Sequence, residues 1–171
     1  MSLLLQPDTH ILWRDVIKGA EDRCAITLRQ ELESYLVSLM MRFTNQTGIA
    51  RQVMAMAFME AMQKGEQERR VSLAQVGDNC LILAGLFPKA VTRRQVKLRY
   101  FVDLGQSAYA ALSQRAYDLY GALALQFVVL IDILQSIRES PDMLPLEAYE
   151  LWQEVGSQRA LRILKGYTKK L

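Results

Sequence analysis

The sequence predicts an all-α fold: a single-domain bundle of about six to seven helices around a long central apolar helix. Apolar residues recur at intervals of three and four, the spacing of a helix face, rather than at the interval of two that strands show. Only four prolines and nine glycines interrupt the 171 residues. This length, with 51% hydrophobic and 23% charged residues, fits one folded domain over residues 1–171.

Three helix-start signals support individual helices. In each, a Ser or Thr oxygen is expected to accept a hydrogen bond from a free backbone N–H, while a Gln three residues later reaches back to the chain. Pro145 suits a fourth start, because its fixed φ and missing N–H fit the first helical turn. The three signals are Thr27 with Gln30, Ser72 with Gln75, and Thr92 with Gln95.

These signals, the apolar spacing and the prolines together place seven helices. The second is amphipathic, with one apolar stripe that includes Leu32, Leu36 and Leu39. Pro88 and Pro141 are expected to end the fourth and sixth helices, because proline disfavours the α conformation in the residue before it. The predicted ranges are 8–20, 28–44, 48–64, 73–87, 93–104, 107–139 and 146–164.

The sixth predicted helix is unusual because residues 119–134 contain a single charge, Asp132, and a single amide, Gln126. This run of about 16 residues is shorter than the roughly 20 that a bilayer requires, so we expect a buried helix and no membrane span. A continuous helix over 107–139 would be about 50 Å long, whereas a lone domain of this size is about 40 Å across. The sequence therefore predicts that this helix overhangs the domain, kinks at Gly121 or is covered by a second copy in a homodimer.

Two acidic residues in apolar surroundings are candidate ligand-binding or proton-handling groups. Asp132 lies within a run of Val, Leu and Ile, and Glu60 lies between Met59 and Ala61. A buried carboxylate requires a partner and has a raised pKa. The alternative is that each belongs to a polar helix face or to a buried pair with an arginine. The single His10 argues against the common histidine metal sites, and we predict no metal and no cofactor.

Each of the other candidate binding sites also has an alternative interpretation as an ordinary structural feature. Met56 and Met59 could line an adaptable groove for a peptide or an acyl chain, or they could fill the core. Arg93 and Lys97, one helical turn apart in the most basic stretch of the chain, could bind an anion or form a solvated face. A net charge of +3 is too small to favour nucleic acid as a partner.

Tyrosines and cysteines complete the set of candidates. Tyr109, Tyr117 and Tyr120 could present their hydroxyls to a ligand or a partner chain, or they could lie at the rim of the core. Cys24 and Cys80 are far apart and without a CxxC motif, so we expect two unpaired thiols. Because the first residues also lack the pattern of an export signal, a cytoplasmic location is expected.

The sequence resembles a family of helical bacterial proteins that has no assigned activity. The resemblance implies a bacterial, cytosolic setting and transfers no catalytic, cofactor or ligand-binding role. It covers most of the chain, including residues 7–10 (PDTH), 31–37 (ELESYLV), 85–88 (GLFP), 105–109 (GQSAY) and 147–152 (EAYELW).

Two functional hypotheses follow from these features. The first is a non-enzymatic homodimeric interaction or adaptor module, in which apolar and aromatic area supplies the binding energy. The alternative is a regulator that binds a small apolar or anionic ligand in a pocket between helices. An enzyme is less favoured, because no nucleophile, base and orienting group occur at a recognisable spacing.

Overall fold

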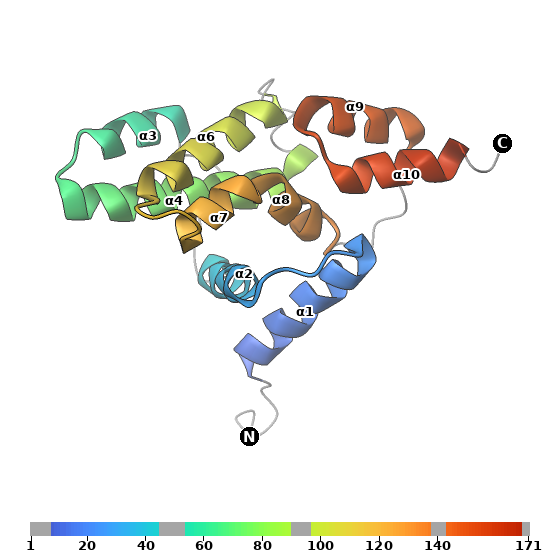
Figure 1. Ribbon diagram of the computed structural model, residues 1–171, viewed down its shortest axis with the longest axis horizontal. Helices are drawn as coiled ribbons and strands as arrows, with labels where there is room; N and C mark the ends of the chain where they lie inside the picture. The colour runs from blue at the N-terminus through green and yellow to red at the C-terminus, as the bar shows by residue number, and fades with distance from the viewer. Residues whose placement is uncertain (1–7, 45–53, 90–96, 138–142, 169–171) are drawn as a thin grey trace.

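The computed structural model describes residues 8–44, 54–89, 97–137 and 143–168, which contain nine helices and no strand (Figure 1). The predicted all-α class is confirmed, with more helices than the seven predicted ranges. The helices are α1 (Thr9–Cys24), α2 (Gln30–Phe43), α3 (Met54–Met62), α4 (Glu66–Leu86), α6 (Leu98–Leu112), α7 (Leu119–Leu125), α8 (Phe127–Gln135), α9 (Pro145–Val155) and α10 (Gln158–Thr168).

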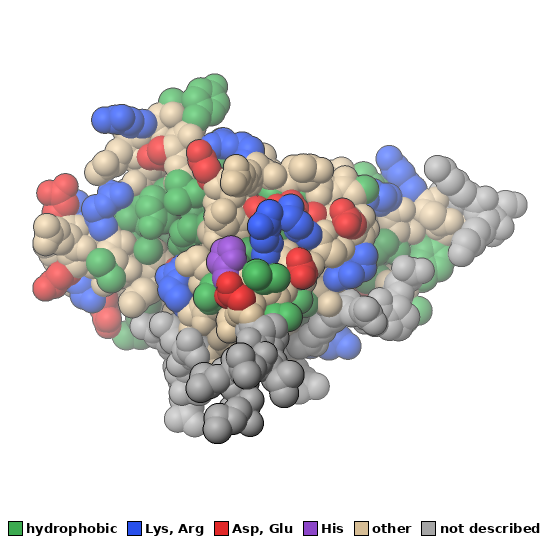
Figure 2. All heavy atoms as spheres, turned by 90° about the horizontal axis from the view of Figure 1, so that it is seen from below, with side chains coloured by type: hydrophobic (Ala, Val, Ile, Leu, Met, Phe, Trp, Pro, Cys, Tyr) green, Lys and Arg blue, Asp and Glu red, His purple; other side chains and the backbone are tan. Residues whose placement is uncertain are grey.

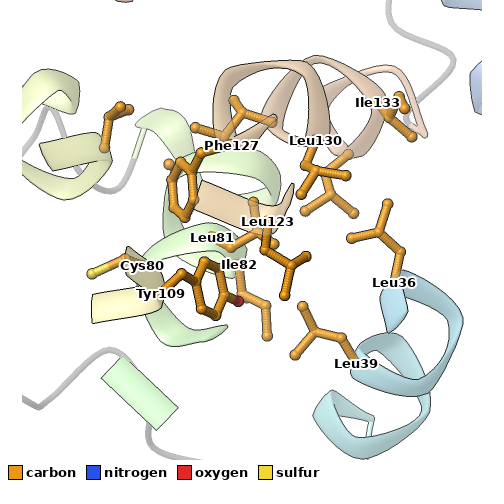
Figure 3. Close-up of a cluster of buried hydrophobic side chains, with 14 of the residues drawn as sticks. Leu36, Leu39, Cys80, Leu81, Ile82, Tyr109, Leu123, Phe127, Leu130 and Ile133 are labelled. Atoms are coloured by element: carbon orange, nitrogen blue, oxygen red, sulfur yellow. The ribbon is translucent and has the colours of Figure 1, made fainter. Parts of the chain in front are cut away.

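Helix α4 lies at the centre of the bundle. It packs against α3, α6 and α8, while α1 and α2 pair on the lower side and α9 and α10 pair at the end that carries the C-terminus (Figure 1). Side chains from α2, α4, α6, α7 and α8 meet in the core (Figure 3). Ten residues of α4 are buried, and the run from Leu81 to Gly85 is buried without interruption. Burial on every side explains why α4 lacks a clean polar face in the sequence.

The predicted single helix over residues 107–139 is wrong. Helix α6 ends at Leu112, the chain turns through residues 113–118, and α7 and α8 follow with a further break at Gln126. Ser113 leaves the helical conformation with ψ 128, and Tyr117 adopts a left-handed φ of 66. The main break therefore precedes Gly121, where a kink was predicted, and the 50 Å helix that motivated a homodimer does not exist.

Two of the predicted start signals are not used. Helix α2 begins at Gln30 without a side-chain cap, and the Leu28 N–H instead donates to the buried Glu21 carboxylate at 2.8 Å. Ser72 lies inside α4, which begins earlier, at Glu66, and its hydroxyl accepts from Lys64. The third signal, Thr92 with Gln95, lies outside the described residues.

The remaining boundaries agree in part with the predictions. Pro145 begins α9 as expected, and α4 ends at Leu86, next to the Phe87-Pro88 pair. The predicted helix over 146–164 is divided at Gly156, whose φ of 73 ends α9 in the left-handed region that glycine tolerates. The predicted end at Pro141 lies outside the described residues.

Within the part of the chain that the structure describes, no helix combines the length and apolar character needed to cross a membrane.

Candidate functional site

Asp132 is buried, and it holds the start of α10. The Ser157 hydroxyl donates to its carboxylate at 2.5 Å, and the Arg159 backbone N–H donates at 3.4 Å. Ser157 itself accepts from the Ala160 N–H as a helix cap. Burial raises the pKa of Asp132, although the Ser157 and Arg159 hydrogen bonds and the nearby arginine charges oppose the shift. The predicted need for a partner is thus met by helix-capping groups, and both carboxylate oxygens are engaged.

The other predicted ligand-binding residues do not gather around Asp132. Glu60, Met56 and Met59 lie on the exposed side of α3, and the two methionines are 59% and 62% exposed. Met56 and Met59 therefore do not fill the core, which was the alternative prediction for them. Met54 and Ala61 supply the buried face of this helix instead. Lys97 is exposed at the start of α6, and Arg93 lies outside the described residues.

The three tyrosines predicted at an interface occupy three different environments. Tyr109 is fully buried, Tyr120 is half-buried, and Tyr117 is 84% exposed. They do not share a helix face, because the break at residues 113–118 separates Tyr109 on α6 from Tyr120 on α7. Tyr109 is therefore a core residue and cannot contact a partner from this position, whereas Tyr117 is free to do so.

Tyr109 belongs to a buried polar cluster around Asp78, a residue that was not among the predicted sites. The hydroxyls of Tyr35 on α2 and Tyr109 on α6 donate to Asp78 Oδ1 at 2.5 and 2.6 Å. Arg42 on α2 donates to Asp78 Oδ2 at 3.3 Å and lies over the Tyr35 ring. The Tyr120 ring packs against both other tyrosines, with centroids 6.3 and 6.0 Å away. One carboxylate thus connects α2, α4 and α6.

The electrostatics of the Asp78 cluster favour a structural role. Burial raises the pKa of Asp78, against the lowering effect of the Tyr109 and Tyr35 hydrogen bonds and of Arg42. Burial and the adjacent carboxylate raise the pKa of Tyr109 well above its ordinary value, so this tyrosine stays a hydrogen-bond donor. Within the described ranges, no buried side-chain nitrogen or oxygen lacks a hydrogen-bond partner. The cluster is satisfied internally and presents no orphaned group to a ligand.

An apolar groove lies between the α1–α2 connection and helices α7 and α8. Its volume is about 310 Å³, at the lower end of the range for small-molecule sites. Leu125 on α7 is 79% exposed and Tyr117 is 84% exposed, so two large side chains at the groove stand in water. The lining residues are Ile26, Thr27, Leu28, Arg29, Leu32, Tyr117, Ala122, Leu125, Gln126 and Val129.

The surface around α1 is mixed in character. Figure 2 shows a hydrophobic patch to the left of the histidine and a group of acidic and basic side chains to its right. At the groove itself, Arg29 pairs with Glu31 at 2.8 Å, and both side chains are more than half exposed. Such an exposed pair contributes little stability, but it leaves this edge of the groove close to neutral.

The described residues give no sign of a metal centre, because no three of their His, Cys, Asp or Glu side chains lie together as ligands. No family model matches the chain, and no curated protein or solved structure is detectably similar to it. The groove and its rim are therefore the best-supported candidate site.

Proposed function

We propose that the protein is a non-enzymatic interaction module that forms a homodimer through the surface around Tyr117, Leu125 and the adjoining groove, here called the α7 surface. The observation that supports this proposal is the exposure of two large side chains, 79% for Leu125 and 84% for Tyr117, beside an open apolar groove. Burying such side chains against a partner is favourable, by about 1.5 to 3 kcal/mol for a leucine.

A macromolecular partner fits these exposures better than a small ligand does. A molecule confined to a groove of about 310 Å³ would leave most of Tyr117 and Leu125 in water. A second protein surface would cover the groove and its rim together. Large aromatic side chains at the centre of a covered surface are also the residues that contribute most to protein–protein binding.

A second copy of the chain is the partner that requires the fewest additional assumptions. Closed two-fold dimers are the commonest soluble oligomers, and they join the same patch of both subunits. Two identical patches repel one another when they carry a strong charge of one sign. Because Arg29 is paired with Glu31 within each chain, the groove edge offers both signs and presents little net charge to its copy.

Sedimentation velocity at micromolar concentration tests the proposal. We expect wild-type protein to sediment at about twice the monomer mass of 19.5 kDa. Leu125→Glu should yield monomers, because an unpaired carboxylate is tolerated in water and costly inside an interface. Leu146→Glu is the matched control: Leu146 is 67% exposed on α9, outside the α7 surface. A monomeric wild type, or dimers that persist in Leu125→Glu, would contradict the proposal.

A regulator that binds a small ligand is the second candidate function. It is favoured by the groove volume of about 310 Å³ and by its largely apolar lining, with Arg29 at the edge, where an anionic head group would have to compete with Glu31 for the guanidinium. Native mass spectrometry of protein purified from its own host distinguishes the two functions. A retained small molecule that is lost in Leu125→Glu would favour the ligand, and a bare dimer favours the interaction module.

We also propose a bacterial, cytoplasmic setting for this activity. The resemblance to a bacterial family and the two buried, unpaired cysteines support it. Localisation of the protein in its host, by fractionation followed by immunodetection, would test this setting. Recovery from an extracellular or periplasmic fraction would contradict it.

A further inference from the structure

Tyr117 is held outward by an unusual loop conformation. Its φ of 66 is left-handed, which an aromatic residue rarely adopts. A conformation of this kind persists only where neighbouring contacts determine it, and such positions concentrate at functional sites. We therefore expect the outward direction of the Tyr117 ring, which the loop at residues 113–118 determines, to serve a function.

Asp118 supplies the contacts that determine the loop. Its Oδ2 accepts from the backbone N–H groups of Gln114 and Arg115 at 2.7 and 3.2 Å. Its Oδ1 accepts from the Ser113 hydroxyl and the Gly121 N–H, both at 2.8 Å. These hydrogen bonds lower the pKa of Asp118, so the carboxylate stays ionised and the loop stays closed near neutral pH. Tyr117 is thus presented on a pre-formed turn.

The Tyr117 ring does not fill the groove that lies beside it. The residue borders the groove, but its 84% exposure means that most of the ring lies outside the groove rather than within it. A volume of about 310 Å³ is large enough for an aromatic ring, since sites of this size hold small molecules. A projecting ring and a vacant apolar groove therefore lie next to each other on one chain.

We propose that in the dimer the Tyr117 ring of each subunit inserts into the groove of the other subunit. A two-fold axis between ring and groove places each ring over the opposite groove, so one surface supplies both halves of the contact. The inference rests on the proposed function, which it deepens by naming the residue that enters the groove. A loop fixed before binding lowers the entropy cost of association, which accounts for the hydrogen bonds around Asp118.

Two variants separate the ring from the groove. Tyr117→Ala removes the inserted ring and keeps the groove. Thr27→Trp fills the groove from an exposed lining position and keeps the ring. Each variant alone should dimerise at least tenfold more weakly than wild type. Tyr149→Ala, which truncates a 47% exposed tyrosine on α9, is the matched control and should dimerise normally.

Mixing the two variants gives the decisive result. In a mixed dimer, the intact ring of the Thr27→Trp subunit enters the intact groove of the Tyr117→Ala subunit, and the missing ring faces the filled groove. Native mass spectrometry, which resolves the subunits by mass, should therefore show mixed dimers in excess of both homodimers. Circular dichroism checks that each variant is folded. Gln126→Trp, at another exposed lining position, replaces Thr27→Trp should that variant unfold.

The outcomes distinguish this inference from the function on which it rests. A monomeric wild type overturns both. A wild-type dimer that Tyr117→Ala leaves unchanged overturns the ring insertion alone, because another part of the α7 surface then carries the association. Weakening in both variants without recovery on mixing also overturns it, since ring and groove would then contact different parts of the partner.

Discussion

The substitution Gly77→Ala tests how closely α4 and α6 pack. A Cβ at Gly77 would lie 2.5 Å from Cε1, 2.7 Å from Cδ1 and 2.9 Å from Cζ of the Tyr109 ring. No carbon atoms pack at such distances, so the ring or one of the helices would have to move. Tyr109 is fully buried among core residues, and its hydroxyl is held by Asp78 at 2.6 Å. The ring therefore has little room in which to give way.

The expected magnitude follows from three contributions. Overpacking a well-filled core costs about 1 to 3 kcal/mol, and losing the hydrogen bond to the Asp78 carboxylate costs about 1.5 to 3 kcal/mol. Alanine is better than glycine inside a helix by about 1 kcal/mol, which offsets part of this loss. We therefore expect Gly77→Ala to lower the free energy of unfolding by about 1.5 to 5 kcal/mol.

Urea unfolding followed by circular dichroism measures this change. Gly166→Ala in α10 is the control, because a Cβ there would meet nothing within 4 Å. That variant should gain up to about 1 kcal/mol from helix propensity alone. If Gly77→Ala were as stable as Gly166→Ala, the close approach of Tyr109 to α4 would not constrain the fold, and the reasoning would fail.

Further predictions concern buried polar groups. Burial raises the pKa of Asp78 in the folded protein above its unfolded value of about 3.9. The protonated Asp78 carboxyl therefore contributes its full stabilisation below the unfolded pKa, and this contribution is lost as pH rises through the folded pKa. Urea titrations should show wild type losing stability relative to Asp78→Asn as pH rises above about 4, and a constant difference would contradict this. Ser157→Ala should lower the free energy of unfolding by about 1 to 3 kcal/mol, through the lost helix cap and the lost donor to Asp132; an unchanged urea midpoint would show that the hydroxyl is dispensable. Burial raises the pKa of Cys24, and that of Cys80 to about 12, so both thiols should react with a thiol reagent only after denaturation, and rapid labelling of native protein would be the contrary result.

Sequence periodicity was sufficient for the fold class and for several helices, because a helix that buries one face repeats its apolar residues on that face. It failed where tertiary contacts override local preference. Residues 107–139 contain no proline, and the break at 113–118 depends on Asp118 binding backbone N–H groups around it. Likewise, Glu21 captures the Leu28 N–H through a contact between α1 and the start of α2 that no local capping rule contains.

The candidate sites were harder to predict than the helices. Asp132 was recognised as buried because its neighbours in sequence are apolar, and that reasoning identifies burial without identifying the partner. Asp78 was passed over, although Tyr35 and Arg42 lie two turns apart on one face of α2 and could have suggested a shared partner. The exposure of Tyr117 depends on the break before α7, so a prediction that assumed a continuous helix grouped it with Tyr109 and Tyr120 on one helix face.

The Asp78 cluster also bears on how long the folded state persists. Its hydrogen bonds join residues 43 and 31 positions apart in the chain, so they require α2, α4 and α6 to have docked already. Contacts that form after the folding transition state slow unfolding without speeding folding. In stopped-flow experiments, truncating Tyr35 to Phe should therefore raise the unfolding rate and leave the folding rate nearly unchanged. A slower folding phase would instead place the cluster in the folding nucleus. By this reasoning, one buried carboxylate governs the lifetime of the native state rather than the speed at which it is reached.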